Sequence, residues 1–182
     1  ITYEIERNVN VKNEIKPMID SFVKEYDKNK EIITFKNIVA CRIAYLIETG
    51  GLIISRVPVL IWLHKTIYSG IIKNAGMFRD KNYVEIVEEA ENTEIQFCSY
   101  DAVHACLENV LENEISALKD FNVENHIQRI TVLIQKIWQI HPFYTGSTIT
   151  IILFLFMYAR SMGYPIDVNY FIENGIFLRK MI

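Results

Sequence analysis

The sequence predicts one all-α domain that carries a small β-hairpin. Apolar residues recur at helical spacing along most of the 182 residues, and only one region alternates apolar and polar residues. No internal repeat, low-complexity tract or linker interrupts these patterns. A chain of this length can bury a sizeable core, so we predict a single domain over residues 1–182.

Two helices are predicted at the start of the chain. Residues 35–48 have a helical pattern, and Gly50 and Gly51 lie just past its end, where glycine is favoured. Residues 13–28 form the earlier helix, which places six apolar side chains on one face. These are Ile15, Met18, Ile19, Phe22, Val23 and Tyr26.

A third helix and a hairpin follow. The helix is predicted over residues 57–71, with Pro58 near its start. Residues 82–87 and 94–98 alternate apolar and polar side chains, which predicts two short paired strands. Acidic residues at the hairpin tip could recognise a basic target, although such a run is more often a solvated surface. The tip carries Glu88, Glu89 and Glu91.

Helical patterns resume in the second half of the chain. They cover residues 100–118 and 124–140, then an apolar helix at 148–162 and a short helix after Asp167. The segment from Ile137 to Ala159 has no charged residue and approaches the ~20 residues of a membrane span. Proline, glycine and hydroxyl residues interrupt it, so we predict a buried core helix and no membrane insertion.

The composition fits a soluble globular protein. The chain is 51% hydrophobic with a net charge of −3, and no Lys/Arg stripe points to nucleic acid. No signal peptide is visible, and an Ile at the first position suggests a trimmed N-terminus. An odd number of cysteines without metal-type spacing favours a reducing, cytoplasmic setting. We expect buried small hydrophobes at Cys41, Cys98 and Cys106.

The segment that could carry chemistry is His-Pro-Phe-Tyr-Thr-Gly at residues 141–146. It joins two predicted helices, and Gly146 permits a tight turn there. An imidazole at the mouth of such a loop suits a general base, because its pKa lies near neutrality. A structural histidine that only shapes the loop is the alternative for His141. His64, His104 and His126 have no partner at ligand spacing, so no metal site is predicted.

The order of elements and motifs resembles the Fic family, also called Fido domains, over roughly residues 35–170. The family motif is His-Pro-Phe-x-(Asp/Glu)-Gly-Asn-Gly-Arg-x-x-Arg. It is matched at His141, Pro142, Phe143 and Gly146. The signature before the family's hairpin, its flap, is matched at Ala75, Gly76 and Arg79.

This resemblance implies a nucleotidyltransferase that moves AMP from ATP onto a protein hydroxyl (AMPylation), with Mg²⁺ on the phosphates. His141 would be the general base. The flap of the family binds a target segment by strand-like pairing. The flap positions here are Arg79, Asn82, Tyr83, Val84, Glu85 and Ile86. Vestigial nucleotide-binding positions would be Phe143, Gly146, Ser147 and Thr148.

Most of the family's phosphate and metal ligands are replaced. Thr145 stands in place of the metal-binding acid, and Ser147-Thr148 in place of Asn-Gly. Ile149 and Ile152 stand in place of two arginines, and no neutral side chain donates charge-assisted hydrogen bonds. Each such bond contributes ~1.5–3 kcal/mol. We therefore predict weak or absent ATP and Mg²⁺ binding and impaired AMP transfer.

An inhibitory-type motif is predicted in the helix before the core. Residues 44–51 resemble the family's (Ser/Thr)-x-x-x-Glu-(Gly/Asn), with Glu48 as the glutamate, while Ala44 and Thr49 depart from the pattern. If this helix docks as in the family, Glu48 would face Ile152 and find no arginine. The resemblance thus divides the domain into N-terminal helices at 1–51 and a Fic core at 52–182.

Three functions stay open. The chain could retain weak transfer through His141 and Gly146. Alternatively, it is an inactive binding or regulatory module (a pseudoenzyme) that engages a protein partner through its flap and groove. A third option is an apolar ligand pocket near Ile149 and Ile152. The target, the partner and homo-oligomerisation are left open by the sequence.

Overall fold

The computed structural model describes residues 35–51, 53–87, 93–117 and 123–164. The chain divides into two compact units, Ile1–Gly51 and Leu52–Ile182. The predicted helix at 13–28, the acidic hairpin tip and the short helix after Asp167 lie outside the described residues. The single domain over 1–182 stays a prediction.

The described part of the first unit is one helix, α2 (Phe35–Thr49), close to the predicted 35–48. Its last turn is closed by two hydrogen bonds. The amide of Gly50 donates to the carbonyl of Leu46 at 2.8 Å, and the Thr49 hydroxyl donates to the carbonyl of Tyr45 at 2.7 Å. The helix therefore ends at the glycine pair.

The second unit is helical with one hairpin, which confirms the predicted all-α class. Its helices are α3 (Val57–Tyr68), α4 (Val103–Ala117), α5 (Val123–Ile140) and α6 (Ser147–Ser161), and a short 3-10 helix, η2 (Tyr100–Ala102), precedes α4. Strands β1 (Val84–Val87) and β2 (Thr93–Gln96) pair antiparallel, with Glu85 opposite Ile95 and Ile86 opposite Glu94.

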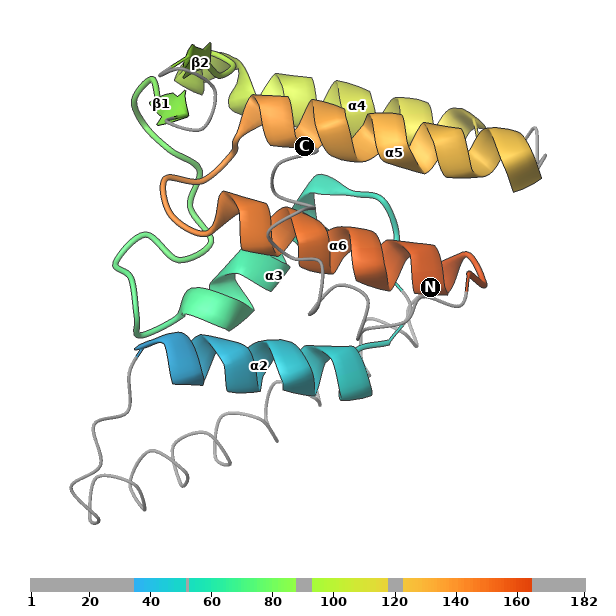
Figure 1. The fold of residues 1–182 in the computed structure, drawn as a ribbon, viewed down its shortest axis with the longest axis horizontal. Coiled ribbons are helices and arrows are strands. Elements are labelled where there is room, and N and C mark those ends of the chain that lie inside the picture. The colour runs from blue at the N-terminus through green and yellow to red at the C-terminus, as the bar shows by residue number, and fades with distance from the viewer. Residues whose placement is uncertain (1–34, 52, 88–92, 118–122, 165–182) are drawn as a thin grey trace. The chain divides into compact units, whose positions relative to one another are not determined.

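Helix α6 forms the centre of this unit. Figure 1 shows α6 with α3 on one side and the α4–α5 pair on the other, and α6 contacts both α3 and α5. Among its side chains, Ile151, Phe154 and Tyr158 are almost completely buried. The prediction of a buried core helix is therefore confirmed. No helix within the described ranges has both the length and the apolarity to cross a bilayer.

Helix α3 ends three residues before the predicted end. The amide and the hydroxyl of Ser69 both donate to the carbonyl of Lys65, and Gly70 has a φ of +76°. A left-handed glycine directly after the last turn ends a helix. The chain then turns toward the hairpin through Gly76, which also has a positive φ.

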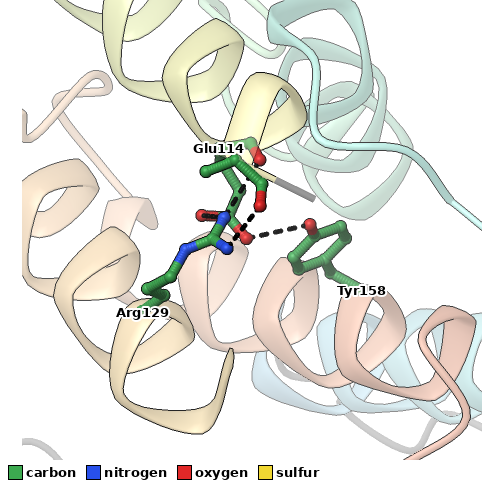
Figure 2. A network of polar contacts seen from close by, with 4 residues as sticks. Glu114, Arg129 and Tyr158 are labelled. Carbon is green, nitrogen blue, oxygen red and sulfur yellow. Dashed lines mark hydrogen bonds and ion pairs between the residues drawn. The ribbon is translucent and has the colours of Figure 1, made fainter. Parts of the chain in front are cut away.

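A polar network joins α4, α5 and α6 at the end of the unit away from the hairpin (Figure 2). The Arg129 guanidinium lies 3.2 Å from a Glu114 carboxylate oxygen and donates to the Ala117 carbonyl at 2.7 Å. The Tyr158 hydroxyl donates to the other Glu114 oxygen at 3.2 Å. Glu114 is buried, and a buried carboxylate without such partners is strongly destabilising. Its role in this network is structural.

The expectation of three buried cysteines is wrong. Cys41 is exposed, and Cys98 and Cys106 are partly exposed. In α4 the buried apolar positions are Val103, Leu107 and Leu111, and Cys106 lies beside that stripe rather than on it.

Candidate functional site

The His-Pro-Phe loop leaves α5 at a left-handed residue. His141 has a φ of +47°, and its amide donates to the carbonyls of Ile137 and Trp138 at 3.2 and 3.0 Å. A positive φ is uncommon for a residue other than glycine and turns the chain sharply. The loop then runs to Gly146, whose φ is +79°, and α6 begins at Ser147.

Arg79 holds the start of this loop against the base of the hairpin. Its backbone amide donates to Pro142 O at 3.0 Å, and its Nε donates to His141 O at 2.8 Å. The guanidinium also donates to three further carbonyls, those of Ile140, Lys81 and Cys98. Arg79 is 3% exposed, so backbone dipoles stabilise this buried cation at the C-terminus of α5.

The imidazole of His141 lies in an aromatic cluster. Its centroid is 4.7 Å from the Tyr83 ring, which is nearly parallel to it, and 4.3 Å from the Phe97 ring. Tyr83 and Phe97 are themselves 5.5 Å apart, so the three rings form a triangle. Both aromatic residues flank the hairpin strands, which places the base of the flap directly against His141.

Burial keeps His141 neutral. The side chain is 6% exposed, and desolvation, with a smaller contribution from the Arg79 cation, lowers its pKa to about 4. Its Nδ1 atom is buried and has no hydrogen-bond partner within the described residues. A neutral imidazole can accept a proton, but this environment disfavours the cation that would result.

A second histidine, His64 of α3, lies beneath the loop. Its Nε2 is 2.8 Å from Thr145 O, and its Nδ1 accepts from the Gly76 amide at 2.8 Å. These partners fix the neutral tautomer with hydrogen on Nε2. The ring stacks on Phe143 with centroids 3.8 Å apart and an interplanar angle of 4°. Sequence reasoning gave His64 no such role, because its partners are 12 and 81 residues away.

The far end of the loop is closed by its own side chains. The Ser147 hydroxyl accepts from the Phe143 amide at 2.8 Å and donates to the Phe143 carbonyl at 2.7 Å. Gly146 lies against Tyr68, and a Cβ at this position would overlap the Tyr68 ring. The Thr150 hydroxyl donates to the Gly146 carbonyl at 2.8 Å. The Phe143 amide is therefore already bonded within the loop.

These residues do not fit ATP with Mg²⁺. Thr145 is exposed and offers a neutral hydroxyl, and Ile149 is 42% exposed at the first turn of α6. Ile152 and Thr148 are partly exposed and uncharged. In the described part of the chain, no group of three or more His, Cys, Asp or Glu side chains could hold a metal ion. The predicted absence of a metal ligand in the motif stays a prediction.

The other predicted positions lie at β1, just before it, and in α2. Asn82 precedes β1, and its side-chain oxygen accepts from the Tyr100 amide at 3.0 Å. Val84, Glu85 and Ile86 belong to β1, and Val84 is 44% exposed. Glu48 lies in the last turn of α2, in the first unit, and its inhibitory-type role stays a prediction.

Comparison with known proteins gives a family and a fold. Similar solved structures include BepC of Bartonella tribocorum with bound AMPPNP (13% identity, TM-score 0.61, 75% of this chain and 70% of that one). Another is the N-terminal Fic domain of a Bep effector from Bartonella sp. AR 15-3 (22% identity, TM-score 0.63, 79% and 66%). No curated protein matches the chain. The sequence model of the Fic/DOC family matches residues 56–159, more than half of the 182 residues, and the chain therefore belongs to that family.

Proposed function

We propose that this chain descends from AMP transferases and that its transfer of AMP from ATP to protein hydroxyls is impaired or lost. The observation that carries the proposal is the closed loop. Ser147 occupies both backbone groups of Phe143, so the amide is not offered to an anion. The uncharged Ile149 and Ile152 support the same conclusion, because phosphate binding depends on charge-assisted bonds.

The size of the expected loss follows from these replacements. Two arginine–phosphate bonds at ~1.5–3 kcal/mol each amount to ~3–6 kcal/mol. At ~1.4 kcal/mol per factor of ten, that is roughly two to four orders of magnitude in rate before any metal contribution. The low pKa of His141, about 4, opposes general-base catalysis as well.

Nucleotide binding provides the first test. BepC was crystallised with AMPPNP, so the same analogue with Mg²⁺ can be titrated into this chain by calorimetry. We expect no binding tighter than about millimolar. Labelled ATP with cell lysate is the companion measurement, with His141→Ala as the background. Transfer by the native chain that His141→Ala abolishes would overturn the proposal.

Restoring the motif in two stages separates the effect of the missing ligands from the effect of the closed loop. Thr145→Glu with Ile149→Arg is expected to stay inactive, because the Ser147 hydroxyl still closes the loop. Adding Ser147→Asn, Thr148→Gly and Ile152→Arg opens the loop and returns both cations. Transfer gained only in the five-residue variant supports the proposal. Robust transfer by the two-residue variant contradicts it.

The second candidate is a module that binds a protein partner through the flap. The observation in its favour is that β1 and β2 are the only strands in the described residues, so each has an outer edge with no neighbouring strand there. Strand addition to such an edge is a common mode of peptide recognition. A partner captured by the native chain should be lost when residues 84–96 are replaced by a short glycine linker. Capture that survives this replacement excludes the flap as the contact.

A further inference from the structure

The hairpin meets α4 through a pair of cysteine side chains. The Sγ atoms of Cys98 and Cys106 lie 3.6 Å apart, in contact. Cys98 follows β2 after Phe97, and Cys106 is in the first turn of α4. Both side chains are partly exposed, so a small oxidant can reach them. A disulfide needs a separation of ~2.05 Å, so the sulfurs need to approach by only ~1.5 Å.

The backbone around Cys98 is fixed to the site already described. Its amide donates to the Gln139 carbonyl at 3.2 Å, and its carbonyl accepts from the Arg79 guanidinium. The residue before it, Phe97, contacts the His141 ring at 4.3 Å. A covalent bond at Cys98 would therefore act on the segment that connects the flap with α5 and His141.

We propose that Cys98 and Cys106 are a redox-sensitive pair that forms an intramolecular disulfide and thereby fixes the base of the flap to α4. The oxidant is a small disulfide such as glutathione disulfide. One cysteine, as its thiolate, attacks a sulfur of the oxidant, so a mixed disulfide forms and one small thiolate leaves and takes up a proton. The second cysteine thiolate attacks the protein sulfur of that mixed disulfide and expels the other small thiol. The protein loses two protons and two electrons, and the oxidant gains them as it becomes two small thiols.

The surroundings of Cys98 slow attack by its own thiol near neutral pH. Burial raises the pKa of its thiol, as do the hydrogen bond and charge of Cys106 and the charge of Asp101, while the Arg79 cation lowers it. A smaller thiolate fraction reduces the rate of attack but does not change the equilibrium geometry. The proposal does not depend on whether AMP transfer survives.

Mass spectrometry of the native chain tests the bond. The chain is incubated with glutathione disulfide and then alkylated without reduction. We expect one linked peptide that contains Cys98 and Cys106, with Cys41 alkylated or glutathionylated. Cys41→Ser is the matched control and should form the same link to the same extent. Cys106→Ser should instead accumulate Cys98 as a persistent mixed disulfide.

Two further results decide the proposal. If the native chain also accumulates only mixed disulfides, or forms the link only in denaturant, the pair is not poised to close and the proposal fails. Amide hydrogen exchange then tests the consequence. The described hairpin residues 93–98 should exchange about tenfold more slowly in the oxidised chain, because the cross-link restricts local opening. Equal rates in the oxidised and reduced chains would show that the bond does not fix the flap.

Discussion

His64 and His141 are two buried, neutral imidazoles at one loop: His141 is its first residue, and His64 of α3 packs against it. Their hydrogen bonding differs. Both ring nitrogens of His64 have backbone partners, and its ring is stacked on Phe143. His141 also has aromatic neighbours, but its Nδ1 is buried without a partner. A buried polar atom left unpaired costs ~1–3 kcal/mol. The first histidine therefore stabilises the fold, whereas the second is retained at a cost.

This difference separates contacts that the fold requires from those that the proposed ancestral AMP transfer would require. The turn at Gly76, the carbonyl of Thr145 and the ring of Phe143 all depend on His64. None of these contacts depends on a nucleotide. Ile149 and Ile152, which follow His141 in the motif, are uncharged, and this supports the proposal that transfer of AMP is impaired. The contacts of His64 hold the loop in shape whether or not that transfer occurs.

The largest expected effect is that of His64→Ala. The substitution leaves the Gly76 amide and the Thr145 carbonyl unpaired and removes the stack on Phe143. We expect a loss of about 3–5 kcal/mol in the free energy of unfolding, measured by urea denaturation. His104→Ala, at an exposed histidine of α4, is the control and should cost less than about 0.5 kcal/mol. Similar losses in both variants would mean that the His64 contacts contribute little.

The pH dependence of stability comes next. Above its unfolded-state pKa of 6.5, His141 is neutral in the folded and the unfolded chain, so protonation of His141 takes nothing from the free energy of unfolding. Between 6.5 and about 4 the unfolded chain binds a proton that the folded chain does not, so stability falls as the pH is lowered. The total loss is on the order of 3 kcal/mol. The lowered pKa of His64, caused mainly by desolvation, acts in the same direction.

Urea denaturation at several pH values measures this effect. His141→Asn does not titrate at this position, so its stability should fall less steeply over the same range. The two curves should run parallel below pH 4, where the native His141 is protonated in both states. An identical slope in the native chain and in His141→Asn would contradict the low pKa of His141.

The sequence predicted the helices well because their signals are local. The apolar spacing and flanking glycines placed α2, α5 and α6 within one residue of their observed ends. The same reasoning extended α3 by three residues, because Ser69 and Gly70 close the helix through contacts that apolar spacing does not register. The local pattern was sufficient to predict helix α3 but not the residue at which it ends.

The site was less accessible to sequence reasoning because its contacts are distant in the chain. The triangle of His141, Tyr83 and Phe97 joins three segments, and no spacing rule relates them. Ser147 could be recognised as a departure from the family motif. That its hydroxyl closes the loop on Phe143 could not be known before the backbone was placed. The sequence thus identifies which motif residues are replaced, and the structure shows that the Ser147 hydroxyl is bonded to the Phe143 backbone.

A smaller effect is expected for Ser147→Ala. The Phe143 amide and carbonyl would both lose their hydroxyl partner, and we expect a loss of about 1–3 kcal/mol in the free energy of unfolding. Thr148→Ala is the matched control on the next residue, where the side chain is partly exposed. The Phe143 amide should also exchange with solvent faster in Ser147→Ala than in Thr148→Ala. Unchanged exchange would show that the hydroxyl is not what closes the loop.

The smallest effect is expected at the residue that first identifies the site. His141→Asn keeps a short polar side chain and places a residue that tolerates positive φ at +47°, while it gives up ring contacts with Tyr83 and Phe97. These terms oppose one another, so we expect a change within about 1 kcal/mol at pH 7.5, against the 3–5 kcal/mol expected for His64→Ala. Urea denaturation of both variants in one buffer measures the contrast. If His141→Asn costs as much as His64→Ala, the two histidines have the same structural role, and the reason to regard His141 as a remnant of catalysis disappears.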